Sequence, residues 1–147
     1  MEVEEPPFQG GVLQQGRLMG HERTNELEGL RATLVQLRQE GKIRLAYLFG
    51  SLANGAEHAR SDIDLAVYLN AENEEDAVEV IDAILVSAEK PVELLRLDDN
   101  EESPFVVQQA LKGVPLVEPD REAYYEVARR ALHEAEAILF RRTGAAA

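Results

Sequence analysis

Hydrophobic residues near the start of the chain recur at helical spacing and are followed by a short apolar run. Four leucines fall on one face of a predicted helix over 24–40, which Gly41 ends: Leu27, Leu30, Leu34 and Leu37. The run over 43–49 is apolar and aromatic, and Gly50 closes it. A run of this length bounded by glycine is typical of a strand that is buried on both faces.

Residues 62–69 alternate between two kinds of side chain, which predicts a second strand with two different faces. One face carries Ile63, Leu65, Val67 and Leu69, and the other carries Asp62, Asp64, Ala66 and Tyr68. Asn73 then favours the start of a helix, because its side chain can cap the free N–H groups of an acidic first turn. The predicted buried stripe of this helix consists of Ala77, Val78, Ile81, Ile84, Leu85 and Ala88.

The second half of the chain predicts one more strand and two more helices. Pro91 introduces a strand over 92–97, and Ser103 followed by Pro104 suits the start of a short helix that ends near Gly113. The remaining elements are a short extended piece over 114–117 and a long helix over 119–142 with a stripe of Tyr124, Val127, Ala131, Ala135 and Ile138.

This order of elements predicts an α/β fold, with a small mixed sheet flanked by helices. A helix joins the second and third strands, so we expect these strands to be parallel, and either paired or one strand apart. No internal repeat or linker divides the chain. We therefore expect one domain over 21–142, preceded by a flexible extension over 1–20 and followed by a disordered tail over 143–147.

Composition and charge narrow the function without defining it. The 147 residues are 45% hydrophobic and 29% charged, as in ordinary globular proteins. The chain has no cysteine, which excludes disulfides, thiolate catalysis and cysteine-ligated zinc, and which fits a cytoplasmic location. No apolar run is long enough to span a membrane. The net charge of −13 argues against direct nucleic acid binding, and is compatible with a basic protein partner or with solubility alone.

A glycine-serine turn directly after the first strand is the first candidate for chemistry. Gly50 and Ser51 precede a predicted helical turn, whose free backbone N–H groups form an anion site. Glycine lets the backbone approach a phosphate closely, and the Ser51 hydroxyl adds a hydrogen bond. Gly55 then allows the chain to turn back towards the sheet. These features together predict a phosphate-binding turn.

Two aspartates at the start of the second strand are candidate metal ligands. Asp62 and Asp64 are two residues apart, so both side chains leave the same face, with Cα atoms roughly 6.5–7 Å apart. Carboxylates at this spacing can bracket two Mg²⁺ ions about 3.5–4 Å apart. Mg²⁺ prefers carboxylate and phosphate oxygens, so a nucleotide can complete its coordination. Glu93, the second residue of the third strand, is the candidate third ligand or general base, because a charge among apolar neighbours needs a partner.

These residues resemble the minimal nucleotidyltransferase proteins of the DNA polymerase β superfamily. The family motif is matched at Gly50, Ser51, Gly55, Ser61, Asp62, Asp64 and Leu65, and the resemblance extends over about 27–139. It implies nucleotide binding by Gly50, Ser51, Gly55 and Ser61. Two positions depart from the pattern of many relatives, which carry arginine where this chain has Leu52 and Asn54. The departures leave the turn without a basic group for the triphosphate.

Small stand-alone proteins of this kind resemble the antitoxins of HEPN–minimal nucleotidyltransferase toxin–antitoxin pairs. The resemblance implies Mg²⁺-dependent transfer of AMP from ATP to a tyrosine of the partner HEPN ribonuclease, within a possible hetero-oligomer. One alternative is an antitoxin with little or no activity that masks the toxin by binding. A second is an aminoglycoside-type adenylyltransferase, which the short chain disfavours because such enzymes usually need additional substrate-binding elements.

Overall fold

The computed structural model describes residues 21–50 and 62–142, and the side chains from residue 27 onward within the first of these ranges. The predicted extension over 1–20, the tail over 143–147 and the turn over 51–61 lie outside the described residues. The described part has the elements α2 (His21–Gln39), β1 (Ile43–Phe49), β2 (Ile63–Leu69), α3 (Glu74–Ser87), β3 (Val92–Arg96), α4 (Pro104–Leu111), β4 (Val114–Pro115) and α5 (Arg121–Arg142).

The four strands form one mixed sheet in the order β3-β2-β1-β4, which confirms the predicted α/β class. β1 pairs antiparallel with both β2 and β4, whereas β2 and β3 are parallel and directly paired. The prediction of parallel second and third strands is therefore confirmed. Their connection runs through α3, as a parallel connection requires.

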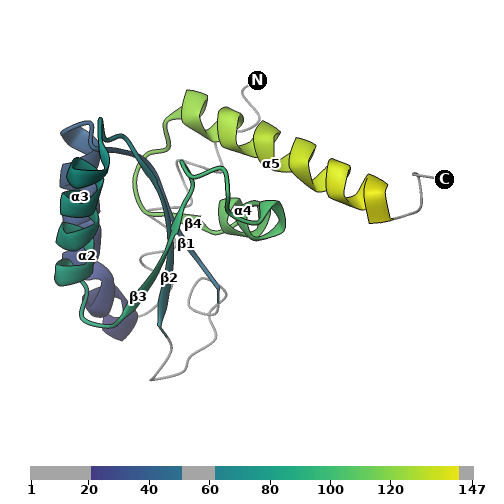
Figure 1. The fold of residues 1–147 in the computed structure, drawn as a ribbon. Helices are drawn as coiled ribbons and strands as arrows, with labels where there is room; N and C mark the ends of the chain where they lie inside the picture. Colours follow the sequence, from purple (N-terminus) through teal and green to yellow (C-terminus); the bar gives the residue numbers. More distant parts are fainter. Residues whose placement is uncertain (1–20, 51–61, 143–147) are drawn as a thin grey trace.

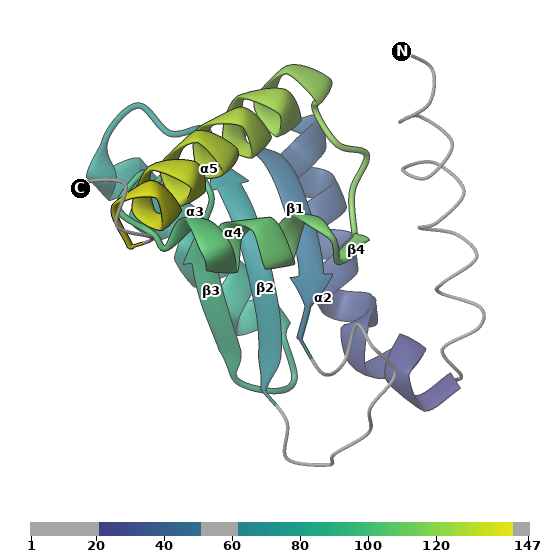
Figure 2. The same ribbon diagram turned by 90° about the vertical axis from the view of Figure 1, so that its right-hand side faces the viewer.

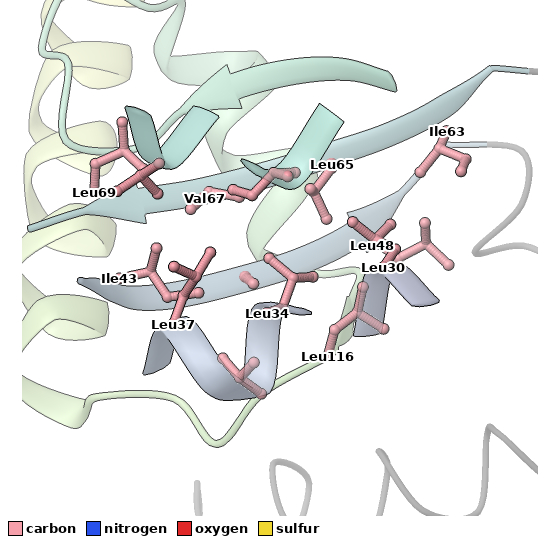
Figure 3. Close-up of a cluster of buried hydrophobic side chains, with 14 of the residues drawn as sticks. Leu30, Leu34, Leu37, Ile43, Leu48, Ile63, Leu65, Val67, Leu69 and Leu116 are labelled. Carbon is pink, nitrogen blue, oxygen red and sulfur yellow. The ribbon is translucent and has the colours of Figure 1, made fainter. Parts of the chain in front are cut away.

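Helices cover both faces of the sheet, with α2 and α3 on one side and α4 and α5 on the other (Figure 1). The core between the sheet and the first helix pair contains the predicted leucine stripe of α2, in which Leu30 and Leu34 are fully buried. Alternate residues of β2 point into this core, as Figure 3 shows. The alternation predicted for β2 is thus the physical basis of the layered fold.

Asn73 caps α3 as predicted, because its side-chain oxygen accepts a hydrogen bond from the Asp76 N–H at 2.8 Å. The predicted buried stripe of α3 is wrong in part, since Val78 is 46% exposed and Leu85 is 40% exposed. Val80 is buried in their place. The observed stripe of Ala77, Val80 and Ile84 follows helical spacing, and Val78 and Leu85 lie outside it.

The second core lies between the sheet and α5, and polar contacts at its edge hold α5 in place. Val127 and Ala131 are buried there, in agreement with the predicted stripe. The Arg44 guanidinium donates to Asp120 just before the helix at 3.0 Å, and the Tyr68 hydroxyl donates to Glu126 at 3.3 Å. The long helix is therefore anchored to β1 and β2 mainly through its first half.

The packing of α3 predicts unequal effects of two neighbouring truncations. Ile84→Ala removes a fully buried side chain and should lower the free energy of unfolding by about 2–5 kcal/mol. Leu85→Ala, in a half-exposed position, should cost less than about 1 kcal/mol. Urea denaturation of both variants measures the difference. Equal costs would contradict the observed stripe and restore the one predicted from the sequence.

Candidate functional site

The ends of β2 and β3 bring two of the three predicted carboxylates side by side. Asp64 is the register partner of Glu93 in the parallel β2–β3 pair, so their Cα atoms lie about 4.8 Å apart with side chains on the same face. Asp62 directly precedes β2 and is exposed. On the other side, Asp64 faces Phe49, the last residue of β1. The site therefore lies where β1 ends and β2 and β3 begin, at one end of the sheet (Figure 2).

The surroundings of the Asp64 carboxyl group disfavour its ionised form. Partial burial raises its pKa above the ordinary aspartate value, and the charges of Glu93 and Asp62 raise it further. A hydrogen bond between the Asp64 and Glu93 carboxyl groups has the same effect. Like charges gathered in this way favour a bound cation, because a cation lowers the energy of every ionised carboxylate in contact with it.

Gly50 makes room for the Asp64 carboxylate. Its φ is +80°, a conformation that only glycine adopts without strain. A Cβ atom built at Gly50 would collide with Asp64 Oδ2 and would lie 3.0 Å from Asp64 Cγ. The sequence argument assigned Gly50 to phosphate approach and missed this contact. The antiparallel pairing of β1 with β2 was the signal that could have found it, since it sets residue 50 beside the start of β2.

Glu93 lies beside Asp64 because of strand register, and not because of the burial that the sequence argument assumed. The sequence argument assumed that apolar neighbours bury Glu93, whereas the residue is exposed on β3, an edge strand of the sheet. Its relation to Asp64 comes from strand register. Two parallel strands that start at the same end of the sheet place their second residues side by side, and that pairing defines the site.

The donor set suits a hard cation such as Mg²⁺, which binds oxygen ligands. Among residues 21–50 and 62–142, no group of three or more carboxylate, imidazole or thiol side chains is arranged to hold a metal ion. The pair of Asp64 and Glu93, with Asp62 beside it, supplies carboxylate oxygens only. Such a set fits a Mg²⁺ ion that takes its other ligands from water and phosphate.

The remaining predicted site residues cannot be compared with the structure. Ser51, Gly55 and Ser61 lie outside the described residues, as do Leu52 and Asn54. Gly50 is the described member of the predicted phosphate-binding turn, and it lies against Asp64. The described structure therefore joins the start of that turn to the carboxylate site.

A cavity of about 700 Å³ lies at the other end of the sheet, where β1 begins and β2 ends. Its lining includes Lys42, Asn70, Glu72 and Asp76. This cavity has neither the paired carboxylates nor the glycine contact of the Asp64 site. We therefore place the candidate chemistry at Asp64 and not in this cavity.

Comparison with known proteins identifies the family to which the chain belongs. The fold is that of a nucleotidyltransferase domain, and residues 33–122 match the family described as "Polymerase beta, Nucleotidyltransferase". The match spans more than half of the chain, so the chain belongs to this family. The family-level part of the resemblance seen in the sequence is therefore confirmed. No curated protein matches the chain.

Similar solved structures share the fold at low sequence identity. A chain of the "toxin-antitoxin with AMP-PNP" has a TM-score of 0.59 and 22% identity, covering 77% of this chain and 92% of that one. A chain of the "toxin-antitoxin MntA-HepT" has a TM-score of 0.53 and 19% identity, covering 78% and 91%. A chain from Shewanella oneidensis has a TM-score of 0.53 and 15% identity, covering 78% and 90%.

None of the described helices is long and apolar enough to cross a membrane.

Substitution of Gly50 tests the contact with Asp64. Gly50→Ala forces an alanine into positive φ and pushes its Cβ into the carboxylate, so it should destabilise the protein by roughly 2–4 kcal/mol. Gly41→Ala is the matched control, because Gly41 has φ +78° with nothing within 4 Å of the added Cβ. It should cost about 1–2 kcal/mol. Urea denaturation of both variants, and of Gly50→Ala combined with Asp64→Ala, gives the coupling. Equal costs at positions 50 and 41 would contradict the contact.

The raised pKa of Asp64 predicts that its ionised form destabilises the metal-free fold. The folded-state pKa lies above the unfolded value, so stability falls as the pH rises through the folded-state pKa and stays lower at neutral pH. With a chelator present at neutral pH, Asp64→Asn should therefore raise the melting temperature slightly. The gain should vanish at pH values below the ordinary aspartate range, where both states are protonated. Differential scanning calorimetry at both pH values measures it, and a lower melting temperature at neutral pH would contradict the prediction.

Proposed function

We propose that this protein is a Mg²⁺-dependent nucleotidyltransferase antitoxin that transfers AMP from ATP to a tyrosine of a partner HEPN toxin. The observation that carries the proposal is the register pairing of Asp64 with Glu93 beside Asp62, in a chain of the nucleotidyltransferase family. Paired carboxylates at a strand end suit the binding of a metal-complexed triphosphate. The proposal assigns two Mg²⁺ ions to Asp62, Asp64 and Glu93.

Each residue of the site has a proposed task. Asp62 and Asp64 hold the ions that neutralise and orient the triphosphate, and Mg²⁺ supplies the positive charge that stabilises the transferring phosphoryl group. Ser51 and the backbone N–H groups of the turn that Gly50, Gly55 and Ser61 delimit bind the phosphates. Glu93 completes the ligand set and accepts the proton of the attacking hydroxyl.

The proposed reaction is one displacement at the α-phosphorus of ATP. The phenolic oxygen of the acceptor tyrosine forms a bond to this phosphorus while the bond to the oxygen bridging the α- and β-phosphates breaks. Pyrophosphate leaves with that oxygen and its electron pair. The phenolic proton passes to the Glu93 carboxylate and then to solvent. The products are an adenylylated tyrosine and pyrophosphate.

Three observations support a protein acceptor: the likeness to toxin–antitoxin structures, the share of their length that this chain covers, and its net charge. Similar chains come from crystal structures of toxin–antitoxin complexes, one of them with AMP-PNP, and this chain covers about nine-tenths of their length. The net charge of −13 favours a basic partner such as a ribonuclease. A hetero-oligomer with the toxin in the cytoplasm follows from this proposal. A small-molecule adenylyltransferase of the aminoglycoside type is a weaker candidate, because the similar solved structures are of toxin–antitoxin pairs.

Intact-mass measurement of the toxin tests the proposal. After incubation with this protein, ATP and Mg²⁺, the toxin mass should increase by whole adenylyl groups, and a chelator should abolish the increase. Asp64→Asn should slow the transfer by about 100-fold or more, since it removes a charge at the reacting centre. Glu79→Gln is the matched control, because it neutralises an exposed carboxylate on α3, and it should keep full activity.

The same variants separate catalysis from masking. An Asp62→Asn/Asp64→Asn double variant that binds the toxin and fails to neutralise it supports adenylylation. Full neutralisation by this variant, with no mass increase by the wild-type protein on a folded toxin, would replace the proposal with masking by binding. Antibiotic resistance conferred by this chain alone would instead favour the small-molecule reaction.

A further inference from the structure

The outer face of α5 carries a second apolar stripe that nothing in the described structure covers. Tyr125, Leu132 and Leu139 recur at intervals of seven residues and are 37%, 51% and 46% exposed. Ala128 lies between the first two at heptad spacing. The buried residues Val127, Ala131 and Ala135 form a separate stripe, about a third of a turn away around the helix. Helix α5 thus carries two apolar stripes, one of which faces the sheet. The second half of the helix projects past α4 (Figure 1).

Charges beside this stripe are arranged for pairing with a second copy of the same helix. Arg129 lies three residues before Leu132, and Glu136 lies four residues after it, and both are exposed. In an antiparallel pair centred on Leu132, Arg129 of each copy lies within one residue of Glu136 of the other, about 1.5 Å along the helix axis. A parallel pair would instead oppose arginine to arginine and glutamate to glutamate. Charge complementarity therefore favours the antiparallel arrangement.

The net charge of α5 also favours a second copy over a basic partner. The helix has five arginines and four glutamates, a net charge of +1, within a chain of net charge −13. Two acidic copies repel one another less where they meet through this helix than where they meet through α3, whose charged residues are all acidic. A partner of positive charge would instead be attracted to the acidic surfaces of the chain. The two kinds of partner therefore suit different faces of the molecule.

We infer that the outer face of α5 is a self-association surface, through which two copies of this chain form an antiparallel helix pair about a two-fold axis at Leu132. Leu132 packs against its own counterpart, and Tyr125 packs against Leu139 of the other copy. Two Arg129–Glu136 ion pairs flank the contact. The ring of Tyr124 meets that of Tyr125 edge-on at 5.4 Å and 78°, which holds Tyr125 at the surface. This inference does not depend on the proposed function.

Single cysteines test the geometry cleanly, because the chain contains no cysteine. With a short bismaleimide linker, Leu132→Cys should give a covalent dimer. Tyr125→Cys alone and Leu139→Cys alone should not, because equivalent positions then lie about 21 Å apart across the two-fold axis. A mixture of those two variants should give the dimer. Dimers from Tyr125→Cys alone would overturn the antiparallel arrangement.

Sedimentation velocity over a concentration series tests the association itself. The wild-type chain should dimerise, and Leu132→Glu should raise the dimer dissociation constant by at least about tenfold, because two like charges meet at the axis. Val78→Glu, at a comparably exposed valine on α3, should leave the dimer unchanged. Arg129→Glu and Glu136→Arg should each weaken the dimer, and the double variant should restore it. Circular dichroism checks that each variant is folded.

Three outcomes would overturn the inference. The first is a wild-type chain that stays monomeric at every concentration. The second is a Val78→Glu variant that dissociates as readily as Leu132→Glu. The third is cross-linking of Leu132→Cys to a co-expressed toxin carrying cysteine, with no dimer of the chain alone, which would assign the face to the toxin. If Leu132→Glu does not fold, the cysteine pairs and the charge reversal still decide the question.

Discussion

The carboxylate of Asp64 occupies the space that a side chain at position 50 would need, and the geometry of the site depends on this contact. Because Gly50 has positive φ and no Cβ, the chain can leave β1 directly over the start of β2. The same strand start is in register with β3, which brings Glu93 beside Asp64. One glycine thus allows the end of β1 and a pair of carboxylates to share one end of the sheet. Neither β1 nor β3 could shift by one residue without separating these groups, because a one-residue slip turns each side chain to the opposite face.

The two faces of the sheet have different roles in keeping this arrangement. Alternate residues of β2, such as Ile63 and Leu65, are fully buried against α2 and α3 and fix the strand in position. On the other face, burial changes along the strand within a few residues. Asp62 is exposed, Asp64 is half-buried and Ala66 is fully buried, under the cover of α4 and α5. The Asp64 carboxylate therefore stands at the border between water and the second core. That position lets it interact with solvent-borne ligands while its backbone is held by the sheet.

Periodicity in the sequence predicted the elements and their class well, because each helix and strand depends mainly on its own apolar pattern. The strand over 43–49 and the helix capped by Asn73 are confirmed almost to the residue. The buried stripe of α3 was harder to predict, because Val78 and Val80 are equally apolar. Only the angle at which α3 packs against α2 and the sheet decides which of the two is buried. The contact of Gly50 with Asp64 and the pairing of Asp64 with Glu93 depend on strand order and register. The local apolar pattern does not encode strand order or register, so the sequence predicted candidate site residues with only part of the reason for their positions.

The two partly buried aspartates Asp64 and Asp120 differ in how their surroundings shift their pKa values. Burial raises the pKa of Asp64, and the charges of Glu93 and Asp62 raise it further; among the described residues, no basic side chain perturbs this carboxyl. By contrast, Asp120 has a lowered pKa through its contacts with Arg44 and the Ala123 N–H, although burial opposes the change. Among the described residues, Arg44 therefore neutralises the carboxylate that helps to fix α5, whereas no basic side chain neutralises Asp64 at the strand ends. A local conflict of this kind, within a fold whose other interactions agree with one another, is expected where a ligand supplies the missing charge. Under the proposed function, the same reasoning would let an acidic chain bind a triphosphate, because the cations that relieve the carboxylates would also neutralise the phosphates.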